Sequence, residues 1–190
     1  LLPWSLQTHT PNSATLRLRH TNVPPHLLHS PKGEPLWPHA FEATVHITLA
    51  HQQLRVGLHV RNTGHTAMSF IAALHGYLAT ADIAHARITG ANGLRYWDAR
   101  PNATVSYPVQ QGPICFTGEV DRVYPAFAST LACGEARLHL QQSPNFGQSV
   151  IWNPHAALCA QLPDLPPNAW RHFVCIEAAQ IDTLVLLPPE

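Results

Sequence analysis

The residues Thr44–Val60, T-V-H-I-T-L-A-H-Q-Q-L-R-V-G-L-H-V, carry the clearest structural signal in the chain. Apolar and polar residues alternate on both sides of the short link Ala50–Gln53, which is the period of a strand with one buried face. The link is short enough for a hairpin. We therefore expect two adjacent antiparallel strands, the second ending at the turn-forming residues Asn62-Thr63-Gly64.

Short runs of the same kind recur along the chain. The further candidate strands are Thr15–Arg19, Met68–Leu74, Glu135–Leu140, Ser149–Trp152, Phe173–Glu177 and Thr183–Leu187. The 18 prolines and 10 glycines interrupt the sequence so often that no long window keeps a helical period. Many short strands with turn residues between them predict an all-β fold, an antiparallel sandwich or barrel.

Composition limits the classes of partner. Eleven Lys and Arg residues balance eleven Asp and Glu residues, and charged residues make up only 12% of the 190, so there is no basic field for phosphate backbones or anionic membranes. No apolar run approaches the ~20 residues that span a bilayer. We expect no nucleic-acid and no membrane partner. Because no repeat, low-complexity tract or Ser/Gly linker divides the chain, we expect residues 1–190 to form a single domain.

Cysteine and histidine usage gives no metal signature. The four cysteines, Cys115, Cys133, Cys159 and Cys175, form no Cys-x-x-Cys pair, so we expect free thiols in a reducing compartment. No charged segment followed by an apolar core suggests a secretory signal, which favours a cytoplasmic location. The fourteen histidines are scattered, no glycine-rich phosphate loop precedes a helix, and we expect neither a metal nor a cofactor.

Three strand-like segments place titratable residues where apolar ones are expected. One ends at His75, a second holds Glu119, Asp121 and Arg122, and a third ends at Glu177. Taken singly, they are explained by a hydrogen-bonded core histidine, a surface ion pair and a solvated strand end. Together they form an acid/base set, because histidine titrates near ~6.5 and partial burial can raise a glutamate toward ~6.

At these same segments the sequence resembles the aldose 1-epimerase (mutarotase) superfamily and, within it, the glucose-6-phosphate 1-epimerase branch. The matching stretches occur in family order: Leu36–Phe41, Ala73–Leu78, Gly93–Asp98, Gly118–Tyr124, Ser149–His155 and Phe173–Ala178. The most specific part is the succession E-V-D-R-V-Y, V-I-W-N-P and F-V-C-I-E-A.

The resemblance implies a large antiparallel β-sandwich of the galactose mutarotase-like type, with a sugar or sugar phosphate bound on one sheet. It implies that His75 is the general acid at the ring oxygen and Glu177 the general base at the anomeric hydroxyl, on opposite sides of the pyranose. Asp121 would bind sugar hydroxyls. The implied activity is α/β anomer interconversion of a hexose 6-phosphate by ring opening and closure, without a metal or cofactor.

The sequence also departs from the family pattern. Gly76 and Leu78 stand where Thr and Phe are usual after the histidine, and His155 replaces an aromatic residue. Relatives carry further strands before the point corresponding to Leu1, including arginines that grip the phosphate and a second active-site histidine. We therefore expect this chain to be the C-terminal portion of a longer family domain.

Two other functions stay open at this point. A mutarotase for unphosphorylated aldoses would use the same acid and base. A non-catalytic carbohydrate-binding β-sandwich would instead use tryptophans such as Trp97 or Trp152 as stacking platforms. The sequence leaves the oligomeric state undetermined.

Overall fold

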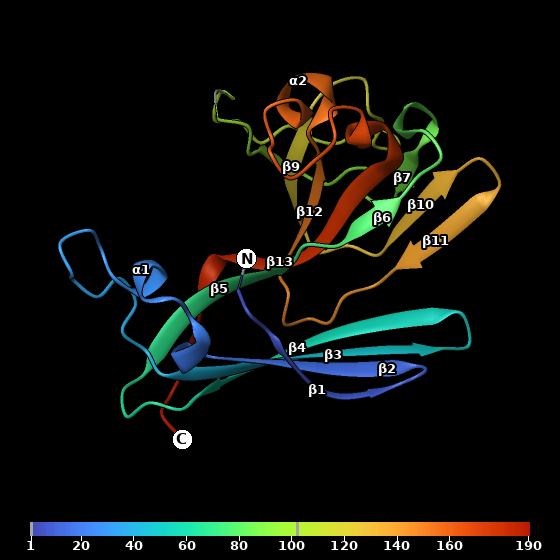
Figure 1. The fold of residues 1–190 in the computed structure, drawn as a ribbon. Helices are drawn as coiled ribbons and strands as arrows, with labels where there is room; N and C mark the ends of the chain where they lie inside the picture. The colour runs from blue at the N-terminus through green and yellow to red at the C-terminus, as the bar shows by residue number, and fades with distance from the viewer. Residues whose placement is uncertain (1, 102) are drawn as a thin grey trace. The chain divides into compact units, whose positions relative to one another are not determined.

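The computed structural model describes residues 2–101 and 103–190, and its regular structure is almost entirely β (Figure 1). The strands are β1 (Ser5–Thr10), β2 (Ser13–Arg19), β3 (Phe41–Ala50), β4 (Gln53–Asn62), β5 (Met68–Leu74), β6 (Tyr77–Ala79), β7 (Arg87–Thr89), β8 (Trp97–Asp98), β9 (Val120–Pro125), β10 (Ser129–Cys133), β11 (Ala136–Leu140), β12 (Gln148–Asn153) and β13 (Phe173–Leu187). The paired strands run antiparallel. The predicted all-β class is confirmed.

The helical segments are single turns. They are η1 (His20–Asn22), α1 (Pro25–Leu28), η2 (Ile83–His85), α2 (His155–Cys159) and η3 (Ala169–His172). Within the described residues, no helix has the length and apolar character needed to cross a membrane.

The chain divides into two compact units, one formed by Leu1–Phe70 with Val185–Glu190 and the other by Ile71–Leu184. The first unit contains a four-stranded sheet in the order β1-β2-β3-β4. Strands β3 and β4 form the hairpin predicted from Thr44–Val60, with Ala50 paired to Gln53. The two residues of its tight turn, His51 and Gln52, both have positive φ, as a type I′ hairpin turn requires.

The turn after β4 is held by one buried side chain. Asn62 is 2% exposed, and its Nδ2 donates hydrogen bonds to the carbonyl oxygens of Thr66 and Leu187, at 2.8 and 3.1 Å. Its Oδ1 accepts from the backbone N–H of Gly64. The predicted Asn62-Thr63-Gly64 turn is therefore present, and the asparagine satisfies backbone groups that the turn leaves unpaired.

The second unit contains most of the larger sheet, ordered β5-β13-β12-β9-β8, with β6 also paired to β13 (Figure 1). On β12, Ser149, Ile151 and Asn153 are buried, whereas Val150 and Trp152 are partly exposed. This alternation gives the sheet one face toward the core and a second face that carries polar side chains.

The core of the second unit lies on the face that carries Ile151. Its buried members include Ile83, Ile88, Ile114, Phe116, Val120, Tyr124, Leu131, Ile151 and Val174. Ile88 belongs to β7 and Leu131 to β10, which are strands of a three-stranded sheet ordered β11-β10-β7. The two sheets of this unit therefore share one apolar core, as expected for a sandwich. Each such side chain contributes about 1.5–3 kcal/mol through burial.

One strand is longer than the sequence suggested. Phe173–Glu177 and Thr183–Leu187 are predicted as separate strands, but both lie in β13, which has 15 residues. The intervening residues 178–182 contain no glycine or proline to end a strand. The pairing of β13 with β5, β6 and β12 then supports it along its length.

Candidate active site

His75 lies in the short connection between β5 and β6, where the backbone N–H of Gly76 donates to the carbonyl of Leu74. Strand β6 is antiparallel to β13, with Tyr77 opposite Cys175 and Ala79 opposite Phe173. Continuing this register by two residues on each strand brings His75 opposite Glu177. The observed distance from His75 Nε2 to Glu177 Oε1 is 3.3 Å.

The two side chains differ sharply in exposure. The imidazole of His75 is 48% exposed, whereas the carboxyl-bearing side chain of Glu177 is only 6% exposed. Burial, together with a smaller contribution from the negative charge of Asp121, raises the pKa of Glu177 to about 7. A carboxyl with this pKa holds or accepts a proton near neutral pH, which is what a general base requires.

Two aromatic rings contact the half-exposed imidazole. Tyr77 stacks on His75 with the ring centroids 5.0 Å apart and an interplanar angle of 25°, and Trp152 meets the imidazole edge-on at 5.7 Å. Phe173 packs against Tyr77 at 4.9 Å and against Trp152 at 5.8 Å. These contacts restrict rotation of the imidazole and hold it beside Glu177.

Asp121 lies on the same face of the sheet as Glu177. It pairs with Trp152 on β12, and Trp152 pairs in turn with Cys175 on β13, two residues before Glu177. Residues paired across strands, and residues two apart along a strand, point to the same face. The structure therefore brings together all three residues predicted from sequence, His75, Glu177 and Asp121.

Asp121 is also a perturbed carboxyl. Burial raises the pKa of Asp121 to about 6, and the negative charges of Glu119 and Asp98 act in the same direction. The Arg100 guanidinium opposes them, although it pairs directly with Asp98 at 2.6 Å rather than with Asp121. The site therefore has two carboxyls whose protonation changes close to neutral pH.

Arg122 has a structural role on the opposite face of β9. Its Nη1 donates to the Oε1 of Gln110 at 3.2 Å, and its guanidinium lies 4.6 Å above the ring of Tyr96. The same Gln110 oxygen accepts from the hydroxyl of Tyr124 at 2.8 Å. Nothing in the sequence singles out Gln110. It is a loop glutamine, and its partners become apparent only once the fold has placed β9 beside the loop.

The distance between the acid and the base corrects one expectation. We expect a sugar ring between His75 and Glu177, but 3.3 Å leaves no space for a ring. The two groups instead lie side by side. In this arrangement one can donate a proton and the other accept one at two neighbouring atoms of the same molecule.

A third group lies at the same place. A ring nitrogen of His75, the Sγ of Cys175 and a carboxylate oxygen of Glu177 all lie within 4.8 Å of one another. Three such donors could surround a cation, but burial raises the pKa of Cys175 far above its ordinary value. The thiolate, not the thiol, is the metal ligand, so a cation at this place would have to displace the thiol proton.

Comparison with protein families gives one match across the chain. The family model described as "Aldose 1-epimerase" matches residues 2–190. A curated protein of Escherichia coli (strain K12), named "Putative glucose-6-phosphate 1-epimerase", is 27% identical over 181 residues. The match covers 94% of this chain and 58% of the E. coli protein.

Solved structures share the fold. A structure from Salmonella typhimurium described as a "putative mutarotase" superposes with a TM-score of 0.75 at 22% identity, covering 98% of this chain and 60% of that one. A "galactose mutarotase related enzyme" from Lactobacillus acidophilus gives a TM-score of 0.67 at 15% identity, covering 98% and 66%. The fold predicted from the sequence, of the galactose mutarotase-like type, is therefore confirmed.

Proposed function

This chain belongs to the aldose 1-epimerase family, and we propose that the protein is a mutarotase that interconverts the α and β anomers of a hexose 6-phosphate. The observation that carries the proposal is the 3.3 Å contact between His75 and Glu177 on the polar face of the sheet. The chain spans about 58% of the length of the curated E. coli relative. The proposed activity is therefore that of the whole protein, to which this chain contributes the acid and the base.

In the proposed reaction, the Glu177 carboxylate takes the proton of the anomeric hydroxyl while the His75 imidazolium donates a proton to the ring oxygen. The bond between the anomeric carbon and the ring oxygen breaks, and the electron pair leaves with the oxygen, giving the open-chain aldehyde. Rotation about the bond between the first and second carbons exposes the other face of the carbonyl. Closure with the two roles reversed forms the opposite anomer and restores both groups.

The side-by-side geometry suits this chemistry. The ring oxygen and the anomeric oxygen are bonded to the same carbon, so a donor and an acceptor 3.3 Å apart can each face one of them. The sugar then approaches with the edge that carries both oxygens. Each positioned group is typically worth ~10²–10⁴-fold in rate, which is sufficient for a hemiacetal that already opens slowly in water.

Asp121 is proposed as the residue that binds sugar hydroxyls. It lies on the same face as Glu177 and accepts hydrogen bonds whenever it is ionised. Its charge also contributes to the raised pKa of Glu177. Asp121 would thus orient the sugar and strengthen the neighbouring base.

The phosphorylated substrate is supported by the name of the curated relatives. The runner-up, a mutarotase for unphosphorylated aldoses, uses the same pair and differs in its response to inorganic phosphate. A non-catalytic carbohydrate-binding module is favoured by one observation only. Trp97 is 38% exposed, and its pairing with Val123 places it on the same face of the sheet as Asp121. That function would survive loss of Glu177.

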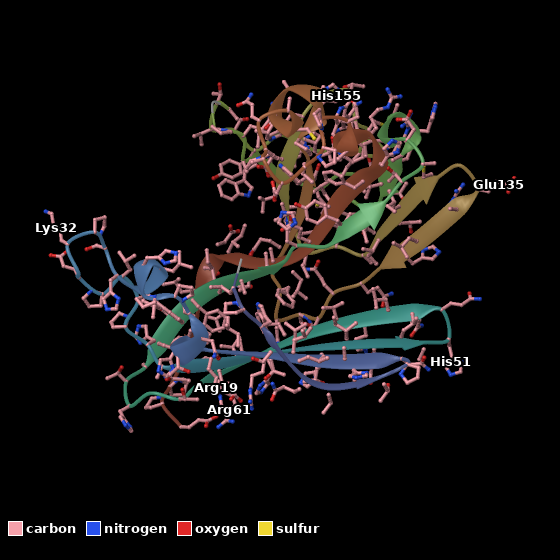
Figure 2. The ribbon with its side chains drawn as sticks, in the orientation of Figure 1. Arg19, Lys32, His51, Arg61, Glu135 and His155 are labelled. Carbon is pink, nitrogen blue, oxygen red and sulfur yellow. The ribbon has the colours of Figure 1, made fainter. Side chains whose placement is uncertain are left out.

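The test is exchange spectroscopy by NMR on glucose 6-phosphate with the full-length protein. We expect the protein to speed α/β exchange, and Glu177→Gln to remove the acceleration. The matched control is Glu135→Gln, the same chemical change at the outer end of the β10–β11 hairpin, where Figure 2 labels that side chain. An unchanged exchange rate with wild-type protein, or full activity in Glu177→Gln, contradicts the proposal. Free glucose as substrate and competition by inorganic phosphate separate the two mutarotase alternatives.

We further propose that residues 1–190 act as part of one mutarotase-like domain in the cytoplasm. One family model matches residues 2–190, which supports the single domain. All four cysteines are free, and unpaired thiols are typical of reducing compartments. The proposed partner is a small-molecule sugar phosphate, with no nucleic acid and no membrane.

A further inference from the structure

Cys175 is a buried residue beside the candidate site. It precedes Glu177 by two residues on β13, so the two side chains point to the same face of the sheet. Cys175 is 0% exposed, and its Sγ lies within 4.8 Å of both a His75 ring nitrogen and a Glu177 carboxylate oxygen. The buried thiol therefore lies beside the proposed acid/base pair.

We propose that Cys175 is a positioning residue for the Glu177 base: its thiol fills the space beside the carboxyl and keeps strong hydrogen-bond donors out of it. This inference rests on the proposed function, because it assigns Cys175 an effect on the base of that reaction. Cysteine packs as a small hydrophobe whose S–H is only a weak donor. It therefore fills the site without stabilising the carboxylate.

The neighbouring strands explain why a small residue stands here. Cys175 is paired with Trp152 on one side and with Tyr77 on the other. Both rings also contact the His75 imidazole. A large residue between them would displace the imidazole from Glu177, whereas a serine would fit but would add a strong donor.

The hydrogen bonding of the four thiols sets Cys175 apart. The Sγ atoms of Cys115, Cys133 and Cys159 donate to backbone carbonyls of Pro113, Asp82 and Pro166. Within the part of the chain that the structure describes, Cys175 has no such acceptor. Its Sγ lies instead within 4.8 Å of a His75 ring nitrogen and a Glu177 carboxylate oxygen.

The groups around the Glu177 carboxyl come from four elements. His75 reaches it from the β5–β6 connection, Asp121 lies on β9, Tyr77 on β6, and Cys175 on β13 itself. Among these groups, the negative charge of Asp121 raises the pKa of the Glu177 carboxyl. Burial raises the pKa of Cys175 far above its usual range, so this thiol adds no charge. A new hydrogen bond from position 175 would therefore favour ionisation directly.

The experiment is an NMR titration of the Glu177 carboxyl carbon in the substrate-free full-length protein. We expect Cys175→Ser to lower the Glu177 midpoint by roughly half a unit to one unit, because the hydroxyl donates to the carboxylate. Cys175→Ala should leave the midpoint in place, since removing one sulfur atom frees too little space for a water molecule. Cys159→Ser is the matched control at an equally buried thiol.

The same variants are then compared by the pH dependence of anomer exchange. If the proposal is correct, the acidic limb of the kcat/KM profile in Cys175→Ser shifts by the same amount as the Glu177 titration midpoint. In Cys159→Ser it does not shift. Equal Glu177 midpoints in wild type and Cys175→Ser overturn it. Should Cys175→Ser not fold, a midpoint displaced in Cys175→Ala overturns it as well. Absence of exchange in the wild type would instead overturn the proposed function, which the titration alone does not test.

Discussion

The Nε2 of His75 and the Oε1 of Glu177 lie 3.3 Å apart because the β6–β13 ladder, continued by two residues, places them opposite each other. The imidazole is half exposed, while the carboxyl is buried among β13 and its neighbours. This difference suits the two proposed roles. A buried carboxyl is a stronger base than a solvated one, and a partly exposed imidazole can meet the substrate.

The first prediction concerns the pH dependence of activity. Since burial raises the pKa of Glu177 to about 7, the carboxylate needed as base is lost as the pH falls through that value. We expect kcat/KM to fall about tenfold per pH unit below the midpoint. Anomer exchange measured by NMR between pH 5 and 9 checks this. A flat profile down to pH 5 would show that Glu177 is not the base.

The second prediction concerns stability. A carboxyl whose pKa is raised on folding favours the native state below its unfolded pKa, and this contribution is lost as the pH rises toward the folded value of about 7. Glu177→Gln removes the ionisable group. We therefore expect the variant to be more stable than wild type at pH 9, by up to about 3 kcal/mol, and similar to it near pH 4.

Thermal or denaturant unfolding at both pH values measures this difference. Glu135→Gln provides the control, because Glu135 is exposed on the β10–β11 connection. Equal stability of Glu177→Gln and wild type at pH 9 would contradict a raised pKa for Glu177.

The third prediction concerns Asp121. Replacing it by asparagine removes a negative charge that raises the pKa of Glu177. We expect Asp121→Asn to move the acidic limb of the kcat/KM profile to lower pH. We also expect it to raise KM, because the asparagine is a weaker hydrogen-bond acceptor for the sugar hydroxyls than the carboxylate. Steady-state kinetics across the pH range separate these effects. If KM and the acidic limb of the kcat/KM profile are both unchanged, Asp121 is not part of the site.

The fourth prediction concerns the ring stacked on the imidazole. Tyr77→Ala removes the contact that holds the His75 plane, and we expect kcat to fall about 2- to 10-fold, the equivalent of one aromatic pair. Tyr77→Phe, which keeps the stacked ring, should have the kcat of the wild type. Tyr107→Ala, at a tyrosine that is 60% exposed, is the control. If Phe fails to restore kcat, the hydroxyl rather than the stacked ring is responsible.

Alternation along the chain predicted several strands well. The hairpin of β3 and β4 follows from Thr44–Val60, because a period of two residues and a short link specify both strands and their turn. The segment of strand β9 is strand-like in the sequence, but Asp121 and Arg122 interrupt its apolar pattern, and only the structure gives its bounds, Val120–Pro125. Asp121 and Arg122 lie on opposite faces of the sheet, and only the neighbouring strands show what each face packs against.

The sequence by itself determined the all-β class and the β3–β4 hairpin, and it singled out the three candidate site residues, because periodicity and motif are properties of short segments. The register between strands distant in the chain was decided only in the tertiary structure. That register places His75 beside Glu177 rather than across a sugar ring, sets aromatic rings against the imidazole, and puts the Cys175 thiol close to the carboxyl. The physical reason is that burial and pairing, which set the pKa of Glu177, arise from residues contributed by several strands.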